Sequence, residues 1–182
     1  ASDWSSDVCS SDLAMAMAAL DAGKHVLLEK PMALNLAEAG ELVAKAKQAG
    51  VVHAIAHEFR FAPSRAYAKD LIDQGWLGKL RSVDASLYVA GRVGSLASPT
   101  YTWAAQRAMG GGVLMALGSH FIDALRHWFG DFEGVWGATS VHKPERTDAV
   151  TGEVRMADAD DGFTCTLRFK RDRKSTRLNS SH

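Results

Sequence analysis

Two short apolar runs flank a helical pattern early in the chain, and this arrangement constrains the fold more than any other feature. The first run covers residues 25–28 (HVLL) and the second covers residues 51–56 (VVHAIA). Each run is long enough for a buried strand. Parallel strands need a crossover of this length between them, and such crossovers are almost always right-handed. The sequence therefore predicts a βαβ unit of an α/β fold.

The crossover carries the signals of a capped amphipathic helix. Asn35 can cap its N-terminus with Glu38 as the reciprocal partner, and Gly50 follows its last turn. Apolar residues recur between these caps at helical spacing: Leu36, Ala39, Leu42, Val43 and Ala46. An earlier helix, rich in Ala, Met and Leu, is expected over residues 14–22, because Gly23 follows it.

The order of elements changes at about residue 75. Further along we expect a helix at 63–75, a strand at 80–89, a long loop at 90–108, a helix at 113–129, a strand at 132–142, a polar connection at 143–161 and a strand at 162–170. Strands interrupted by one long helix are typical of an α+β domain. We therefore divide the chain into residues 14–75 and residues 76–171.

The two ends differ from the rest of the chain. Residues 3–13 (DWSSDVCSSDL) and 172–182 (DRKSTRLNSSH) are rich in serine and lack a helix or strand period. A DNA sequence that encodes the second segment has a reverse complement that encodes the first segment in another frame. We therefore interpret residues 1–13 and 172–182 as translated sequencing adapter and expect the gene to be cut at both ends. Two natural flexible tails are the alternative.

The net charge, the apolar runs and the cysteine content argue against several classes of protein. The formal net charge is +0, which gives no electrostatic basis for binding nucleic acid or an anionic membrane. No run of about 18 apolar residues occurs, so no membrane span is expected. Cys9 and Cys165 are the only cysteines. A disulfide framework is therefore not expected, and Cys165 is interpreted as a reduced strand residue of a cytoplasmic protein.

Lys30 is the first candidate for chemistry, because it follows a buried strand directly. The carboxyl ends of strands in open α/β sheets face the ligand crevice. A lysine there can hold a hydroxyl or carbonyl oxygen, and Pro31 can stiffen the loop that directs it. An ordinary strand-to-helix turn with a solvated lysine is the alternative.

The helix at 113–129 carries the second candidate. His120 and Asp123 lie one turn apart on the polar side of this helix, so the carboxylate could orient the imidazole. A histidine with a pKa near the working pH suits general acid–base chemistry. The solvated face of an amphipathic helix is the alternative. Gly110–Gly112 precede this helix and indicate an anion site at its N-terminus, a turn or a close backbone approach.

Other site classes lack support in the sequence. His53 and His57 would lie about 13 Å apart along one strand, too far to share a metal ion, so no metal site is expected. No G-x-S-x-G nucleophile elbow is present.

Taken in order, these motifs resemble the Gfo/Idh/MocA oxidoreductases. Residues 25–51 resemble the Glu-Lys-Pro region of that family, FRFAP with GWLGKLRSV resembles its crossing into a second domain, and residues 110–130 resemble its glycine-rich loop and catalytic helix. The resemblance implies the C-terminal part of a Rossmann-type parallel sheet, followed by an incomplete α+β domain whose open sheet often supports homo-oligomers. The glycine-rich phosphate loop and the ribose-binding acid would precede residue 14.

The resemblance also implies an activity and its residues. Family members mostly oxidise or reduce sugar-like or cyclitol substrates with NAD or NADP. Glu29 and Pro31 would help to place the cofactor, often through a cis Lys–Pro bond, and Trp103 would pack near the nicotinamide. Lys30 would contact the reacting oxygen, and His120 would exchange its proton.

One position departs from the family pattern. Ala116 stands where an aspartate usually precedes the catalytic histidine by four residues. His120 would then rely on Asp123, which we also take as a substrate-binding residue, or serve a variant chemistry such as that of an NAD-using glycosidase. A noncatalytic binding or regulatory protein of the same fold is a further alternative.

Overall fold

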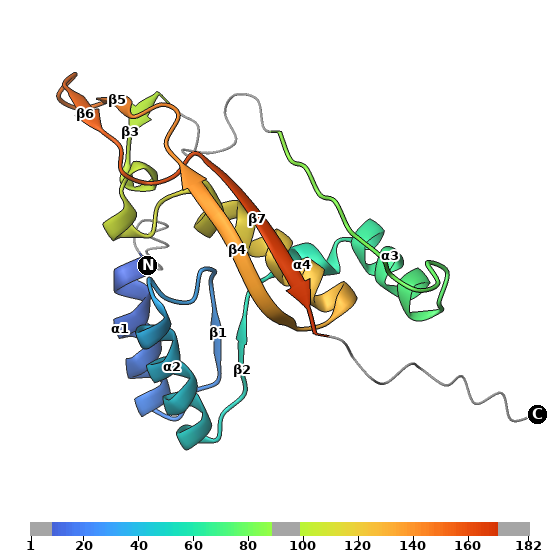
Figure 1. Cartoon of the computed structure of the whole chain (residues 1–182). Helices are drawn as coiled ribbons and strands as arrows, with labels where there is room; N and C mark the ends of the chain where they lie inside the picture. The colour runs from blue at the N-terminus through green and yellow to red at the C-terminus, as the bar shows by residue number, and fades with distance from the viewer. Residues whose placement is uncertain (1–8, 89–98, 171–182) are drawn as a thin grey trace, which may run out of the picture.

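The computed structural model describes residues 9–88 and 99–170, and Figure 1 shows their arrangement. The N-terminal part contains α1 (Cys9–Asp21), β1 (Val26–Leu28), α2 (Leu36–Ala49) and β2 (His53–Ile55). The two strands pair in parallel, with Val26 opposite His53. The predicted βαβ unit is therefore confirmed. Helix α1 begins earlier than the expected helix, within the segment that we interpret as adapter.

A small apolar core holds this unit together. Both helices lie on the same side of the strands (Figure 1), and buried side chains from α1, α2 and the β1–α2 loop meet there: Ala16, Leu20, Ala33, Leu42 and Ala46. The opposite side of the sheet is open, since Leu27 and Val52 remain 75% and 71% exposed. This pair of strands thus offers a further apolar surface for burial.

The caps of α2 follow the sequence signals, with one difference. The Asn35 Oδ1 atom accepts a hydrogen bond from the Glu38 backbone N–H at 3.0 Å. The Glu38 carboxylate accepts from the Leu34 N–H and the Asn35 side-chain amide, rather than from the Asn35 backbone. Gly50 ends the helix in the left-handed region, at φ 65°. These caps fix both ends of the crossover between β1 and β2.

The chain then crosses to the second part through η1 (Glu58–Phe61) and α3 (Pro63–Asp73). The predicted helix at 63–75 is confirmed. The predicted strand at 80–89 is wrong for residues 80–88, which form no ladder with the rest of the described chain; Val89 lies outside the described residues. Every side chain from residue 80 to residue 88 is exposed, so the alternating pattern has no neighbouring surface to cover.

Residues 90–98 of the expected loop at 90–108 lie outside the described residues. From residue 99 the loop contains β3 (Thr100–Tyr101), η3 (Trp103–Ala105) and η4 (Arg107–Met109). The predicted long helix follows in two parts, a π-helical turn η5 (Leu114–Gly118) and α4 (Ser119–Phe129).

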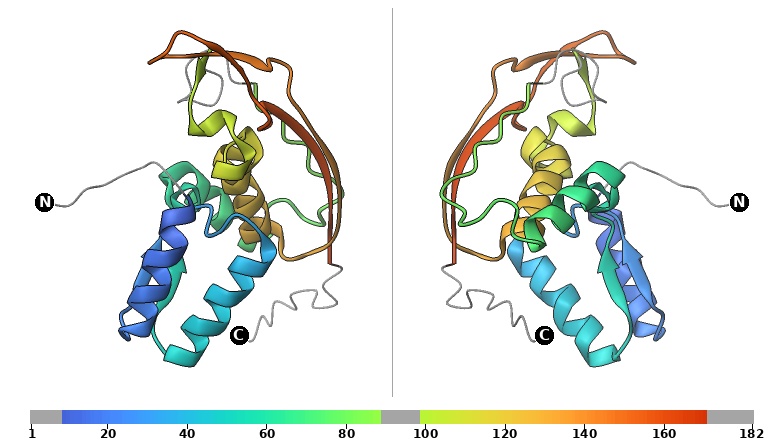
Figure 2. Two further views of the ribbon diagram at one scale, coloured as in Figure 1. Left: turned by 90° about the vertical axis from the view of Figure 1, so that its left-hand side faces the viewer. Right: turned by 90° about the vertical axis from the view of Figure 1, so that its right-hand side faces the viewer.

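An antiparallel hairpin packs along this helix. It consists of β4 (Phe132–Ser140) and β7 (Gly162–Phe169), which confirms the two predicted strands. Figures 1 and 2 show the hairpin lying beside α4. A Cβ atom at Gly118 would come within 2.8 Å of the Phe163 ring, so the absence of a side chain there allows close packing.

The segment at 143–161 is more than the polar connection that the sequence indicates. It contains β5 (Glu145–Asp148) and β6 (Val154–Met156), which pair with each other in antiparallel fashion. Strand β3 adds to β5 in parallel and completes a small sheet of order β3-β5-β6. The strands are short and carry many charged residues, and that composition conceals them in the sequence.

Among residues 9–88 and 99–170, one helical stretch, Arg107–Phe129, is long and apolar enough to cross a membrane by length and composition alone. The same length and composition occur in the core helices of soluble proteins. In this structure the stretch packs against other elements through Phe121, which contacts Phe59, and through Phe129, which contacts Phe169.

Candidate active site

Lys30 joins the two parts of the chain. It follows β1 at the carboxyl end of the parallel pair, and its Nζ atom donates a hydrogen bond to the Ala116 carbonyl oxygen at 3.0 Å. The Lys30–Pro31 peptide bond is cis. Ala116 lies in the π-helical turn, one turn before His120. The Lys30 ammonium is therefore hydrogen-bonded to the segment that leads into the helix expected from the sequence to be catalytic.

His120 lies in the first turn of α4 and is only 3% exposed. The Phe59 ring stacks on the imidazole with centroids 3.9 Å apart, and the His57 ring meets it edge-on at 5.5 Å. The Glu58 Oε1 atom lies 3.9 Å from the imidazole Nε2. The Nδ1 atom is buried and has no hydrogen-bond partner among the described residues. The crossing segment at residues 57–59 thus covers His120 directly.

The surroundings of His120 favour its neutral form. Burial is the main cause that lowers the pKa of this imidazole below its usual value of 6.5, and the positive charge of Lys30 lowers it further. The carboxylates of Glu58 and Asp123 act in the opposite direction. A neutral imidazole beside an ammonium group can accept a proton from a hydroxyl that the ammonium holds.

Asp123 is engaged differently from the expectation. Its carboxylate accepts hydrogen bonds from both Nε and Nη2 of Arg60, with Nε to Oδ2 at 2.9 Å. This bidentate ion pair ties α4 to η1. The structure therefore assigns Asp123 to Arg60, and Glu58 is the carboxylate that lies beside His120. No local pattern in the sequence marks Glu58, Phe59 or Arg60, because their roles depend on contacts between distant segments.

The triple glycine serves close packing. A Cβ atom at Gly111 would lie 2.5 Å from the Ala104 carbonyl oxygen, and one at Gly112 would lie 2.3 Å from Asp160 Oδ1. Asp160 Oδ2 accepts a hydrogen bond from the Leu114 N–H at 2.8 Å. A carboxylate of this chain therefore caps the helix N-terminus. Of the interpretations of the glycines, the turn is observed at Gly110, at φ 76°, and the close backbone approach at Gly111.

The remaining predicted cofactor residues differ in setting. Glu29 is exposed, and Pro31 is half-buried. Trp103 begins η3, where the Thr102 side chain caps the turn. No hydrogen bond or ring contact joins Trp103 to Lys30 or His120 within residues 9–88 and 99–170. The structure thus brings Lys30 and His120 together and leaves Trp103 on a separate turn.

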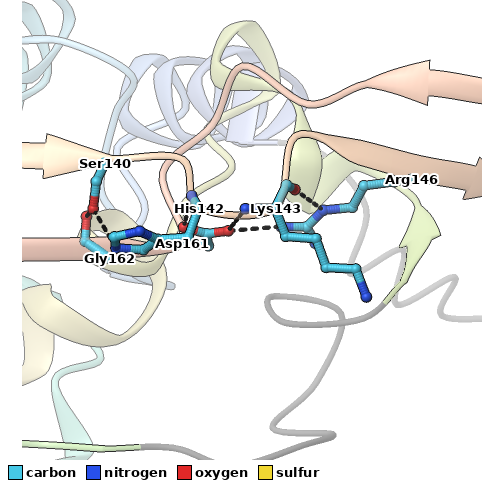
Figure 3. Close-up of polar contacts among 6 residues, drawn as sticks. All are labelled: Ser140, His142, Lys143, Arg146, Asp161 and Gly162. Carbon is cyan, nitrogen blue, oxygen red and sulfur yellow. Dashed lines mark hydrogen bonds and ion pairs between the residues drawn. The ribbon is translucent and has the colours of Figure 1, made fainter.

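A second polar cluster lies where β4 leads into β5, and Figure 3 shows it. The Asp161 carboxylate accepts hydrogen bonds from the backbone N–H groups of His142 and Lys143, at 2.7 and 2.8 Å. The Arg146 guanidinium is 2% exposed and lies 3.8 Å from the same carboxylate. Ser140 Oγ is hydrogen-bonded to His142 Nε2 at 2.8 Å. These contacts hold the turn between the two sheets. No group of three potential metal ligands occurs in the part of the chain that the structure describes.

Comparison with known proteins agrees with this arrangement. Residues 8–57 match the model of an oxidoreductase family with an NAD-binding Rossmann fold, and residues 66–181 match the GFO/IDH/MocA C-terminal domain. The chain belongs to the GFO/IDH/MocA family. The resemblance seen in the sequence is therefore confirmed, as is the fold that it implies, a Rossmann part followed by a C-terminal α/β domain.

Several members of the family are similar to this chain. The uncharacterized oxidoreductase sll0816 of Synechocystis sp. is 40% identical over 161 residues, which cover 87% of this chain and 42% of the relative. Levoglucosan dehydrogenase of Pseudarthrobacter phenanthrenivorans is 32% identical over 169 residues, which cover 85% and 43% of the two chains. A solved structure of levoglucosan dehydrogenase with NADH and levoglucosan has a TM-score of 0.76 at 28% identity, covering 90% of this chain and 43% of that one. The chain spans about two fifths of the length of these relatives.

Proposed function

We propose that the protein containing this chain is an NAD(P)-dependent oxidoreductase that acts on a CH–OH group of a sugar-like or cyclitol alcohol, or on the corresponding ketone. The meeting of Lys30 with the helix of His120 is the observation that carries the proposal. Two groups suited to an oxygen and its proton come from different parts of the fold and lie together. The names of similar proteins, which include levoglucosan dehydrogenase and D-xylose dehydrogenase, agree with a sugar-like substrate.

The residues present fit the reactive end of a nicotinamide cofactor. Strands β1 and β2 run in parallel, and their carboxyl ends lead to Lys30 and His57 at the same edge. Glu29, Lys30 and Pro31 would hold the cofactor at this edge, and Trp103 would pack near its ring. When bound, NAD or NADP accepts or supplies the hydride.

Lys30 and His120 would have different roles at the substrate oxygen, since Lys30 would donate a hydrogen bond to it and His120 would exchange its proton. The Lys30 ammonium has three N–H donors and gives one of them to the Ala116 carbonyl, so it can also donate to a hydroxyl or carbonyl oxygen. His120 is held neutral, so it can take the hydroxyl proton during oxidation and return it during reduction. Phe59 covers one face of the imidazole and keeps water from it.

Replacement of Lys30 tests this assignment. In the full-length gene product, Lys30→Ala is expected to reduce kcat by about 100-fold or more, because the oxygen loses its charged donor. Cofactor affinity should fall less. Lys24→Ala, which removes an exposed lysine before β1, serves as the matched control and should leave kcat unchanged. Turnover of Lys30→Ala at the wild-type rate would remove Lys30 from the mechanism.

Ala116 favours a second candidate, variant chemistry such as an NAD-using glycosidase. A methyl group at this position supplies no carboxylate to His120, so the site differs from one with an acid one turn earlier. The two activities differ in product. The dehydrogenase forms reduced nicotinamide in proportion to substrate, whereas the glycosidase releases a sugar with no net change in the cofactor. A family member that binds the cofactor and a sugar without turnover would show neither product.

We further propose that residues 1–13 and 172–182 derive from sequencing adapter. The reverse-complement relation between their coding sequences supports this origin. Residues 1–8 and 171–182 lie outside the described residues. Sequencing the intact gene from the same source tests the proposal, since natural codons would replace both segments.

We also propose a cytoplasmic homo-oligomer that binds neither nucleic acid nor membrane, in line with the neutral net charge. Size measurement of the full-length protein tests the oligomer.

A further inference from the structure

One acidic side chain near the site has no part in the function proposed above. Glu58 begins η1 and is 65% exposed, yet its Oε1 atom lies 3.9 Å from Nε2 of His120, which is 3% exposed. No hydrogen bond within the described chain engages this carboxylate. The carboxylate of Glu58 is therefore in contact with solvent and lies next to the buried imidazole of His120.

The other acid near His120, Asp123, cannot take this place. Asp123 is engaged by both donors of the Arg60 guanidinium. Ala116, one turn before His120, contributes only a carbonyl oxygen, and Lys30 occupies that oxygen. Glu58 therefore remains as the carboxylate that is available to pair with a protonated imidazole.

The geometry also determines which nitrogen Glu58 can influence. Phe59 stacks on one face of the imidazole and holds the plane of the ring. The Nδ1 atom is enclosed by protein, whereas Nε2 faces the Glu58 carboxylate. A proton added at Nε2 would therefore lie beside a negative charge, while Lys30 and His57 oppose that proton.

We propose that Glu58 is a positioning residue that supplies the carboxylate partner of His120. The inference rests on the proposed oxidoreductase function, because it concerns the group that exchanges the substrate proton. Glu58 offsets part of the positive charge of Lys30 and so makes it easier for His120 to hold the substrate proton. It acts through His120 and does not itself touch the reacting atoms.

The titration of His120 in the full-length protein tests the proposal without any substrate. The imidazole resonance of isotope-labelled histidine is followed against pH, and His120→Asn identifies the signal. The charges that face the imidazole come from Lys30, Glu58, His57 and Asp123. In Glu58→Gln the apparent pKa of His120 should fall by roughly 0.5 to 1 pH unit, as expected for loss of one negative charge about 4 Å away near the surface.

Two further variants complete the test. Glu41→Gln removes an exposed carboxylate of α2 and should leave the titration unchanged. Glu58→Asp keeps the charge on a shorter side chain and should give an intermediate shift. If the reaction proceeds as proposed, the acid limb of kcat/KM for alcohol oxidation should move to lower pH in Glu58→Gln by the same amount.

The outcomes separate this inference from the proposed function. An unchanged titration of His120 in Glu58→Gln would overturn the role of Glu58, whatever the enzyme does. A shifted titration in a protein that oxidises no sugar or cyclitol would support the pairing of Glu58 with His120 and refute the oxidoreductase proposal. A shifted titration with a fixed acid limb would refute the role of the pair in the reaction.

Discussion

Gly111 should tolerate no side chain, because it lies against the backbone of a neighbouring turn. A Cβ atom there would come within 2.5 Å of the Ala104 carbonyl oxygen and within 2.7 Å of the Ala104 carbonyl carbon and the Trp103 oxygen. Ordinary contact begins at 3.4 Å, so the turn would have to retreat by 3.4 − 2.5 = 0.9 Å. All three atoms belong to the backbone, and rotation of a side chain cannot relieve the overlap.

The cost of Gly111→Ala follows from this overlap. Overpacking typically destabilises a protein by about 1–3 kcal/mol. The retreat of the turn would also weaken the hydrogen bond from the Gly112 N–H to the Ala104 carbonyl, now 3.1 Å long, and a hydrogen bond of this kind contributes about 1 kcal/mol. We therefore expect Gly111→Ala to lower the free energy of unfolding by about 2–4 kcal/mol.

The same substitution at Gly40 provides a control with the opposite sign. Gly40 lies within α2, and a Cβ atom there would meet nothing within 4 Å. Alanine in a helix interior is about 0.5–1 kcal/mol more favourable than glycine, so Gly40→Ala should stabilise the protein. Urea unfolding followed by tryptophan fluorescence measures both variants. A Gly111→Ala variant as stable as the wild-type protein would refute the expected overlap between Cβ and the Ala104 backbone.

Two further predictions concern the helix that carries His120. Asp160→Ala removes the cap from the Leu114 N–H and should lower the free energy of unfolding in urea by about 1 kcal/mol, whereas Asp160→Asn, which keeps an acceptor oxygen, should lose less. Because the folded-state pKa of His120 lies below 6.5, the unfolded chain binds more protons, and stability should fall as pH decreases from about 6.5 through the lower folded-state pKa. Urea midpoints should therefore decrease less in His120→Asn over this range, and an equal decrease would contradict the pKa argument.

The βαβ unit could be predicted because its signals are local. The caps at Asn35 and Gly50 and the helical spacing between them act within one segment, and they agree with the two apolar runs. The hairpin of β5 and β6 could not be predicted in this way. Its strands hold charged residues, and Val154 and Met156 are exposed, so no apolar alternation marks them.

The predicted strand at 80–89 shows the opposite error. Its residues alternate in polarity, but a strand also needs a neighbour with free backbone groups. Residues 80–88 have no such neighbour in the described chain, and all of their side chains are exposed. Alternating polarity in the sequence is therefore not enough to form a strand. The strand also has to pair with a neighbour, and that neighbour comes from a distant part of the sequence.

The site was predictable to the same extent. Lys30 and His120 were identified from their places at a strand end and on an amphipathic helix, and the structure brings both to one location. The helical pattern predicts Asp123 as the partner of His120, because the two are neighbours on the helix. Arg60 lies 63 residues away and engages the carboxylate instead. A helical pattern identifies which residues share a face, but it does not identify the partner from another segment.

The contact at Ala116 explains how the site can keep Lys30 in place without an acid at that position. Lys30 is bonded to the main-chain oxygen of Ala116, so the identity of the side chain does not affect this contact. The oxygen belongs to a π-helical turn, where the regular ladder of helix hydrogen bonds is interrupted, a feature that is frequent at functional sites. Alanine at position 116 therefore changes the charge around His120 and leaves the position of Lys30 intact. Position 116 supplies no negative charge to His120, and the Glu58 carboxylate on η1 lies 3.9 Å from its Nε2 atom, where it would supply one.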